Sequence, residues 1–146
     1  MTLAERLRAA MVEARKSRDP ARTLLLSTIL SDLKNRDLEL QRPSSDDEAA
    51  EVLRSGVKRR REAAEQYEKA GRVELAQTEL AQIKIIEEFL PASVPPEEIR
   101  AAVREAVAAG AGTVGAVMGK VMPRFKGRAE GQVINQIVRE ELGSAS

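Results

Sequence analysis

The chain has 146 residues, 42% hydrophobic and 32% charged, and its formal net charge of +1 excludes a global field that would attract polyanions. The absence of cysteine and histidine excludes a disulfide framework, thiolate and imidazole metal ligands, and the commonest general base. No stretch approaches the ~18 apolar residues of a membrane-spanning helix, and the N-terminus lacks the apolar region of a secretory signal, so we expect a soluble, cytoplasmic protein with no membrane partner.

Two helices are predicted at the start of the chain. Thr2 and Glu5 have the spacing of a capping box, which begins the first helix. Asp19 and Pro20 are expected to end that helix and begin the second, as N-cap and first helical residue. The expected apolar stripes are Leu3, Leu7, Ala10, Met11 and Ala14 in the first helix, and Leu24, Leu25, Ile29, Leu33 and Leu40 in the second.

A longer pair of helices follows. Ser45 and Glu48 form a second capping box, and the helix that they begin is predicted to reach Ala70, with Gly71 as its left-handed terminator. The fourth helix is predicted over residues 73–89. The expected apolar stripes are Val52, Leu53, Gly56, Val57, Ala64 and Tyr67 in the third helix, and Leu75, Ala76, Leu80, Ile83, Ile86 and Leu90 in the fourth.

A run of four basic residues starts at Lys58 in the third helix. Consecutive helical residues turn by about 100°, so the four cannot share one face. Two ion pairs at i,i+4 are expected, Lys58 with Glu62 and Arg61 with Glu65. Arg60 differs because it lies within the apolar stripe. It would pair with a buried acid, pack at a domain interface or bind an anionic ligand such as RNA, and a structural role is favoured.

A proline-rich linker, Pro91 to Pro96, separates two predicted domains, 1–91 and 96–146. The second domain begins with a helix that Gly110 closes, and its apolar stripe is Ile99, Val103, Ala106 and Val107. No segment has the alternating pattern of a β-strand. The predicted fold class is therefore all-α, with an N-terminal helical bundle and a C-terminal three-helix domain.

The stretch from Thr113 to Leu142 is predicted to form a helix, a basic turn and a second helix that begins near Glu130. Val114, Val117, Met118, Val121 and Met122 share one face of the first helix, and Val133, Ile134, Ile137, Val138 and Leu142 one face of the second. Residues 120–128 contain four cations and no acid: Lys120, Arg124, Lys126 and Arg128. The free N–H groups of the second helix would lie beside these cations, a pattern typical of an anion site for a phosphate backbone. The alternative is a solvated loop whose charges serve solubility.

Two further features of this stretch have an interpretation. Gly115 and Gly119 lie one helical turn apart, so another backbone could pack closely on that face. Phe125 lies between Arg124 and Lys126, where it would stack on a base or act as a hydrophobic peg that holds the turn. The peg is favoured.

Six short motifs occur along the chain: KRRR at 58–61, YEKAGR at 67–72, FLP at 89–91, MGKVMP at 118–123, KGRAEG at 126–131 and IN at 134–135. In their order and spacing they resemble the YqeY family. That family consists of freestanding relatives of the tail domain of GatB, the B subunit of glutamyl/aspartyl-tRNA amidotransferase. The resemblance covers nearly the whole chain.

The resemblance implies that the C-terminal domain binds tRNA, or another structured RNA, by its backbone. The positions that match the family motif are Lys120, Lys126, Gly127 and Arg128. Glu130 departs from the motif, because the family usually has Asp there, and Asp caps a helix start better than Glu. Amidotransferase subunits and a tRNA synthetase are further implied partners.

No autonomous active site is visible. The chain has no G-x-S-x-G, P-loop or amidase-type serine cluster, and no catalytic residue, metal or cofactor is expected. The family is associated with carbon–nitrogen ligase activity, with glutamine as amido-N-donor, only because the amidotransferase has that activity. The chemistry of the amidotransferase does not occur in its tail domain. We therefore expect an RNA-binding accessory of tRNA-dependent amidation or translation. The alternatives are a non-catalytic protein-interaction module with no RNA role, and a ligase that acts only in complex with amidotransferase subunits.

Overall fold

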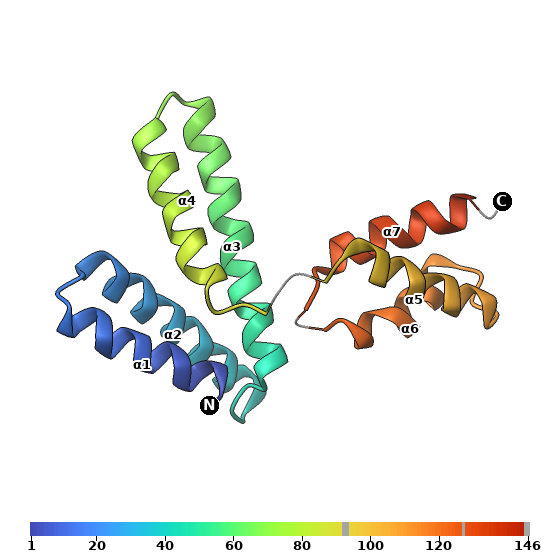
Figure 1. Ribbon diagram of the computed structural model, residues 1–146, viewed down its shortest axis with the longest axis horizontal. Coiled ribbons are helices and arrows are strands. Elements are labelled where there is room, and N and C mark those ends of the chain that lie inside the picture. The colour runs from blue at the N-terminus through green and yellow to red at the C-terminus, as the bar shows by residue number, and fades with distance from the viewer. Residues whose placement is uncertain (92–93, 127, 145–146) are drawn as a thin grey trace. The chain divides into compact units, whose positions relative to one another are not determined.

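A computed structural model describes residues 1–91, 94–126 and 128–144 of the chain (Figure 1). Every regular element in these residues is a helix, which confirms the predicted all-α class. The chain divides into two compact units, Met1–Pro91 and Ala92–Ser146. Independent folding of the predicted domains, 1–91 and 96–146, stays a prediction.

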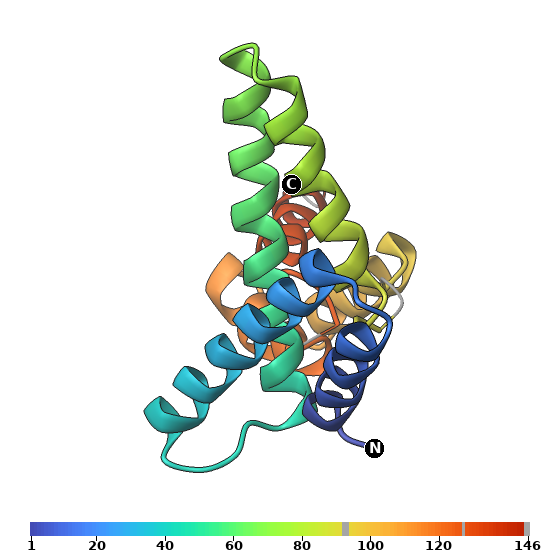
Figure 2. The same ribbon diagram turned by 90° about the vertical axis from the view of Figure 1, so that its left-hand side faces the viewer.

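The first unit consists of two helical hairpins, α1 with α2 and α3 with α4 (Figures 1 and 2). The bounds of these helices are Leu3–Lys16 for α1, Pro20–Leu40 for α2, Asp46–Lys69 for α3 and Val73–Glu87 for α4. The large side chains most completely buried between them are Leu7, Leu26, Leu53 and Ile86. Burial of this apolar surface is the main term that stabilises the unit.

The predicted helix starts in this unit are confirmed. The backbone N–H of Glu5 donates to Thr2 Oγ1 at 3.1 Å, and the N–H of Thr2 donates to Glu5 Oε2 at 3.3 Å, so the first capping box is complete. The box at the start of α3 is complete as well. Asp19 accepts from the N–H of Arg22 at 3.1 Å. Gly71, at φ +75°, follows α3 in the left-handed conformation that glycine adopts at least cost.

The predicted apolar stripes of α2 and α4 are wrong at three positions. Leu24, Leu75 and Leu80 are 70%, 43% and 40% exposed, whereas Leu26 is 0% exposed. Residues 24–26 of α2 are all leucine and therefore point in three directions around the helix. Helix α4 packs mainly on α3. A narrow apolar stripe on α4 is therefore enough for its contact with α3. The buried residues of that stripe are Ala76, Ile83 and Ile86.

A carboxylate network holds the loop between α2 and α3, and the capping box of Ser45 and Glu48 is the part of it that the sequence predicted. Glu48, 6% exposed, accepts from Arg42 Nη1 and Nη2 at 2.7 and 3.0 Å and from the Ser45 N–H at 3.0 Å. The bonds from Arg42, and then the bond from Ser45, lower the pKa of Glu48 from 4.5 to about 2. Asp37 accepts from the hydroxyl and the N–H of Ser44, and these bonds lower the pKa of Asp37.

The second unit contains, within its described residues, three α-helices and one short 3-10 helix. Their bounds are Pro96–Ala108 for α5, Val114–Val121 for α6, Met122–Arg124 for the 3-10 helix η1 and Gly131–Ser144 for α7. The core contains the side chains expected from the helical periodicity at Ile99, Val103, Ala106, Val117, Val121, Ile134, Ile137 and Val138. It also contains Phe125, the predicted peg, and Val94, Ala102 and Ala111, which were not predicted. Met122 and Val133 were also expected on the apolar faces, but they are 37% and 43% exposed.

Candidate nucleic-acid interface

The turn that follows η1 is built on a buried aromatic side chain. Phe125 is 2% exposed and belongs to the core of the second unit, so the predicted peg is confirmed and the ring has no face free for a base. The Phe125 carbonyl accepts from the N–H of Arg128 at 2.8 Å and of Ala129 at 3.0 Å. The Phe125 N–H donates to the Met122 carbonyl at 3.1 Å. The chain on both sides of the ring is therefore held to the core.

Two of the four predicted site cations lie beside the ring of Phe125. The guanidinium carbon of Arg124 lies 6.0 Å, and that of Arg128 5.9 Å, from the centroid of the ring. Arg124 Nη1 pairs with Glu105 Oε2 at 3.0 Å, and Arg128 Nη2 pairs with Glu98 Oε1 at 3.7 Å. These four side chains are between 47% and 74% exposed. Such pairs contribute only about 0–1 kcal/mol, so a phosphate could replace either carboxylate at little cost.

The other two predicted cations, Lys120 and Lys126, are exposed. In the part of the chain that the structure describes, no carboxylate oxygen lies within 4.0 Å of either ammonium group. Lys120 belongs to the last turn of α6, where a cation also interacts favourably with the helix dipole. Gly127, a position that matches the family motif, lies outside the described residues.

Helix α7 begins directly after the turn, as predicted. The N–H groups of Val133 and Ile134 donate to the Glu130 carbonyl at 3.1 and 3.2 Å. The positive end of the α7 dipole is therefore close in sequence to Arg128 and favours an anion at this end of the helix. The carboxylate of Glu130 has the opposite effect, because it repels phosphate.

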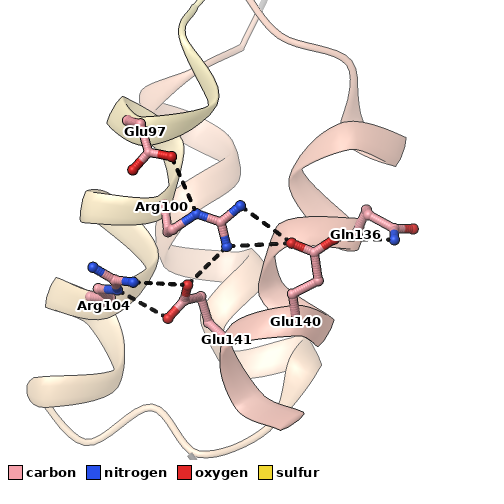
Figure 3. Close-up of polar contacts among 6 residues, drawn as sticks. All are labelled: Glu97, Arg100, Arg104, Gln136, Glu140 and Glu141. Carbon is pink, nitrogen blue, oxygen red and sulfur yellow. Dashed lines mark hydrogen bonds and ion pairs between the residues drawn. The ribbon is translucent and has the colours of Figure 1, made fainter. Parts of the chain in front are cut away.

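A network of ion pairs joins α5 to α7 (Figure 3). Arg100 Nη1 lies 2.9 Å from Glu141 Oε1, Arg100 Nη2 lies 3.3 Å from Glu140 Oε2, and Arg104 Nε lies 3.0 Å from Glu141 Oε2. The bonds from Arg104 and Arg100 lower the pKa of Glu141. The spacing of Arg100 and Arg104, one helical turn apart, was a usable signal that we missed. The network positions α5, which carries the acid partners of Arg124 and Arg128, against α7.

Arg60 belongs to the first unit, where its contacts favour the structural role. Its Nε donates to Gln82 Oε1 at 3.0 Å and its Nη1 to the Gly56 carbonyl at 3.1 Å, so it connects α3 with α4. A Cβ at Gly56 would lie 3.1 Å from Arg60 Nη1. Glycine at this position therefore leaves room for the guanidinium group. The partner is an amide and not the acid that we considered, and RNA binding by Arg60 stays a prediction.

The ion pairs predicted for the rest of the basic run are not present. Among the described residues, Lys58 and Arg61 have no carboxylate oxygen within 4.0 Å. Arg59 instead pairs with Asp32 of α2 at 3.4 Å. Lys58 and Arg61 are exposed, and water solvates such charges at little cost.

Gly115 and Gly119 are exposed on α6. Of the described atoms, none outside the local helix backbone lies within 4 Å of the position that a Cβ would take at either glycine. No other described segment therefore packs closely on this face. Docking of a separate partner there stays a prediction.

Residues 1–91, 94–126 and 128–144 contain neither a metal-binding cluster nor a membrane-spanning helix. These residues contain no group of three carboxylates or other side chains arranged to hold a metal ion. They also contain no helix that is both long and apolar enough to cross a bilayer.

Comparison with known proteins identifies relatives of the chain. A protein family described as Yqey-like protein matches residues 4–142. A protein of Schizosaccharomyces pombe, named uncharacterized protein C22F3.15, is 31% identical over 85 residues. The match covers 58% of this chain and 69% of the yeast protein. The family match spans both units.

Proposed function

This chain belongs to the YqeY family, and we propose that its second unit binds the phosphate backbone of a structured RNA, with tRNA as the expected ligand. The binding surface is the turn between α6 and α7, with Lys120, Arg124, Lys126 and Arg128 as its cations. The resemblance of the turn to the tail domain of GatB, which is understood to hold tRNA, supports this ligand class.

The observation that carries the proposal is the orientation of two arginines by one buried ring. Arg124 and Arg128 each lie about 6 Å from the centroid of Phe125, whose carbonyl also anchors the turn. A loop kept only for solubility needs no such anchor. Guanidinium groups that are already oriented lose less conformational entropy when they bind phosphate, and their planar forks match phosphate oxygens.

The acids near the turn limit the affinity that we expect. Glu98 and Glu105 pair with the two arginines and must be exchanged for phosphate, while Glu130 remains at the start of α7. Lys120 and Lys126 need no such exchange. We therefore propose a site of a few phosphate contacts, which depends strongly on salt because each contact releases counterions.

The proposed role is that of a cytoplasmic accessory to tRNA-dependent amidation or translation. Amidotransferase subunits or a tRNA synthetase are the proposed protein partners. The proposal includes no catalytic residue of this chain, because the carbon–nitrogen ligase chemistry associated with the family does not occur in the tail domain that the chain resembles.

The test is the affinity for several tRNAs at two salt concentrations. Replacing Lys120, Lys126 and Arg128 with Ala should weaken binding to every tRNA about equally, because phosphate contacts carry no sequence information. The salt dependence should fall by roughly two to three phosphate contacts, each about 0.9 log units of affinity per decade of salt for a duplex. Circular dichroism should show an intact fold, because these side chains are largely exposed.

The matched control replaces three exposed lysines of the first unit, Lys34, Lys69 and Lys84, with Ala. This variant has the same net charge as the first and should bind tRNA like the wild type. Two results contradict the proposal: equal losses in both variants, or a wild type without measurable tRNA affinity at low salt.

The second candidate is a protein-interaction module that uses the face of Gly115 and Gly119. The open space over both glycines favours it, because a partner helix could approach the α6 backbone there. Such docking is mainly apolar and would change little with salt. The salt series therefore separates it from RNA binding.

A further inference from the structure

A shallow hollow of about 570 Å³ lies in the first unit, where α1 ends and α2 begins. Its lining combines Ala14, Pro20 and Leu24 with two basic residues, Arg15 and Arg18, one acidic residue, Asp19, and the hydroxyl residues Thr23 and Ser27. The volume lies in the usual range of sites for small ligands or for one or two side chains. The turn proposed to bind RNA, between α6 and α7, belongs to the second unit and not to this one.

Leu24 makes this hollow different from an ordinary polar surface. It is 70% exposed, although Leu25 and Leu26 beside it are 4% and 0% exposed. A single exposed leucine is common on protein surfaces. Here, however, the leucine lines a hollow together with Pro20, and both face solvent.

The two arginines of the hollow have no carboxylate partner within the described residues. Glu13, two residues before Arg15 in the chain, pairs with Lys16 at 3.8 Å. The Asp19 carboxylate caps α2 by accepting from a backbone N–H. Arg15 and Arg18 are therefore available to an acidic ligand.

Arg18 also has a backbone conformation that an arginine seldom adopts. Its φ is +56°, in the left-handed region. Two backbone hydrogen bonds close the end of α1 at this residue: the Arg18 N–H donates to the Arg15 carbonyl, and the Asp19 N–H donates to the Ala14 carbonyl. The same pair of bonds ends α2, where Gln41 is left-handed, and α3 and α5, where glycine has the left-handed conformation, at Gly71 and Gly110. At α1 the chain carries an arginine at this position in spite of the backbone cost, and strain of this kind is often retained at binding sites.

We propose that the hollow binds an acidic peptide segment, with an apolar side chain against Leu24 and Pro20 and carboxylates on Arg15 and Arg18. An RNA backbone would satisfy the two arginines but would leave the leucine in water. An anionic membrane could contact Leu24 and both arginines, and it is the alternative that titration with anionic vesicles tests. A peptide with a leucine between acidic residues would bury Leu24, pair with both arginines and fit into the hollow.

The experiment is a titration of the ¹⁵N-labelled 146-residue chain with a synthetic ten-residue peptide in which one leucine is flanked by aspartates and glutamates. NMR detects weak binding and locates it. Chemical shifts should change at the amides of residues 14–27 and stay constant in α4 and in the second unit. The same peptide with serine in place of leucine should bind about tenfold more weakly, because it buries no apolar side chain.

Two matched pairs of variants test the residues. Leu24→Ser should weaken peptide binding about tenfold, whereas Leu38→Ser, at a leucine that is 67% exposed on the same helix, should leave it unchanged. Arg18→Gly should raise the melting temperature by about 4 °C, because it relieves the left-handed strain, and should still weaken binding. Gln41→Gly removes the same strain at the end of α2, where φ is +58°, and should stabilise without affecting binding.

Several results would overturn this inference. The inference is wrong if millimolar peptide changes no chemical shift, or if the changes are centred outside residues 14–27. It is also wrong if Leu24→Ser and Leu38→Ser weaken peptide binding equally, or if RNA or anionic vesicles shift the same amides as much as the peptide does. The variant with Ala at Lys120, Lys126 and Arg128 should bind the peptide like the wild type. Loss of RNA binding and loss of peptide binding are therefore distinguishable.

Discussion

Each of the two phenylalanines of this chain has two arginine side chains beside its ring. Phe89, 7% exposed, has the guanidinium carbons of Arg6 and Arg22 at 5.8 and 6.0 Å from its centroid, and Phe125 has the corresponding pair at its own ring. A chain with only three aromatic residues thus uses two of them for the core and for orienting cations. The sequence indicated the buried peg, because isolated aromatics near helix ends generally pack. It did not indicate which arginines would lie on the ring, since that depends on the path of the turn.

The lowered pKa of Glu48 predicts how the stability of the protein depends on pH. Its folded-state pKa is about 2, compared with an ordinary value of 4.5, because Arg42 and Ser45 donate to the carboxylate. A group whose pKa is lowered on folding contributes stability above its unfolded pKa and loses it as the pH falls through the folded pKa. The free energy of unfolding should therefore decrease between about pH 4.5 and about pH 2. Glu48→Gln should flatten this decrease, as measured by urea unfolding at several pH values. An unchanged pH dependence in the variant would show that other carboxylates are responsible.

At the scale of the helices, local rules predicted starts and ends better than buried faces. The capping box of Ser45 and Glu48 and the end of α3 before Gly71 depend on neighbouring residues only, and both are present. The exposure of Leu75 and Leu80 was not predicted, because periodicity shows which residues share a face and not which neighbour covers it. The bond from Arg60 to Gln82 spans 22 residues and was equally outside the reach of local patterns.

The exposed face of α6 predicts the effect of a larger side chain at Gly119 on stability. Gly119 lies in the last turn of α6, and no described atom outside the local helix backbone is within 4 Å of the position that a Cβ would take. Glycine costs about 0.8–1.0 kcal/mol relative to alanine in a helix interior, and leucine is nearly as favourable as alanine. Gly119→Leu should therefore raise the melting temperature slightly or leave it unchanged, as measured by circular dichroism. A decrease of several degrees would show that a segment packs on this face. Loss of binding to a partner by the stable variant would support the interaction module.

At the scale of the whole molecule, helical periodicity was sufficient for the all-α class and for the order of the helices. The proline-rich linker lies where the first compact unit ends, at Pro91. The cations of the candidate site were found from the sequence because they are close together along the chain. Their carboxylate partners were not found, since Glu98 and Glu105 lie on α5, about 20 to 30 residues from the arginines that they contact. Only the folded chain brings these groups together.

The composition of the two cores leads to the last prediction. Every buried member of the first core lies between Leu3 and Phe89, and every member of the second lies between Val94 and Val138. Each unit therefore buries an apolar core of its own, which is the requirement for folding alone. Residues 1–91, expressed alone, should give a helical spectrum and a single cooperative thermal transition. Residues 94–146 should unfold at a lower temperature, because a shorter chain buries a smaller fraction of its surface. A first fragment that loses its helical signal gradually, without a cooperative transition, would show that the two units are not separable domains.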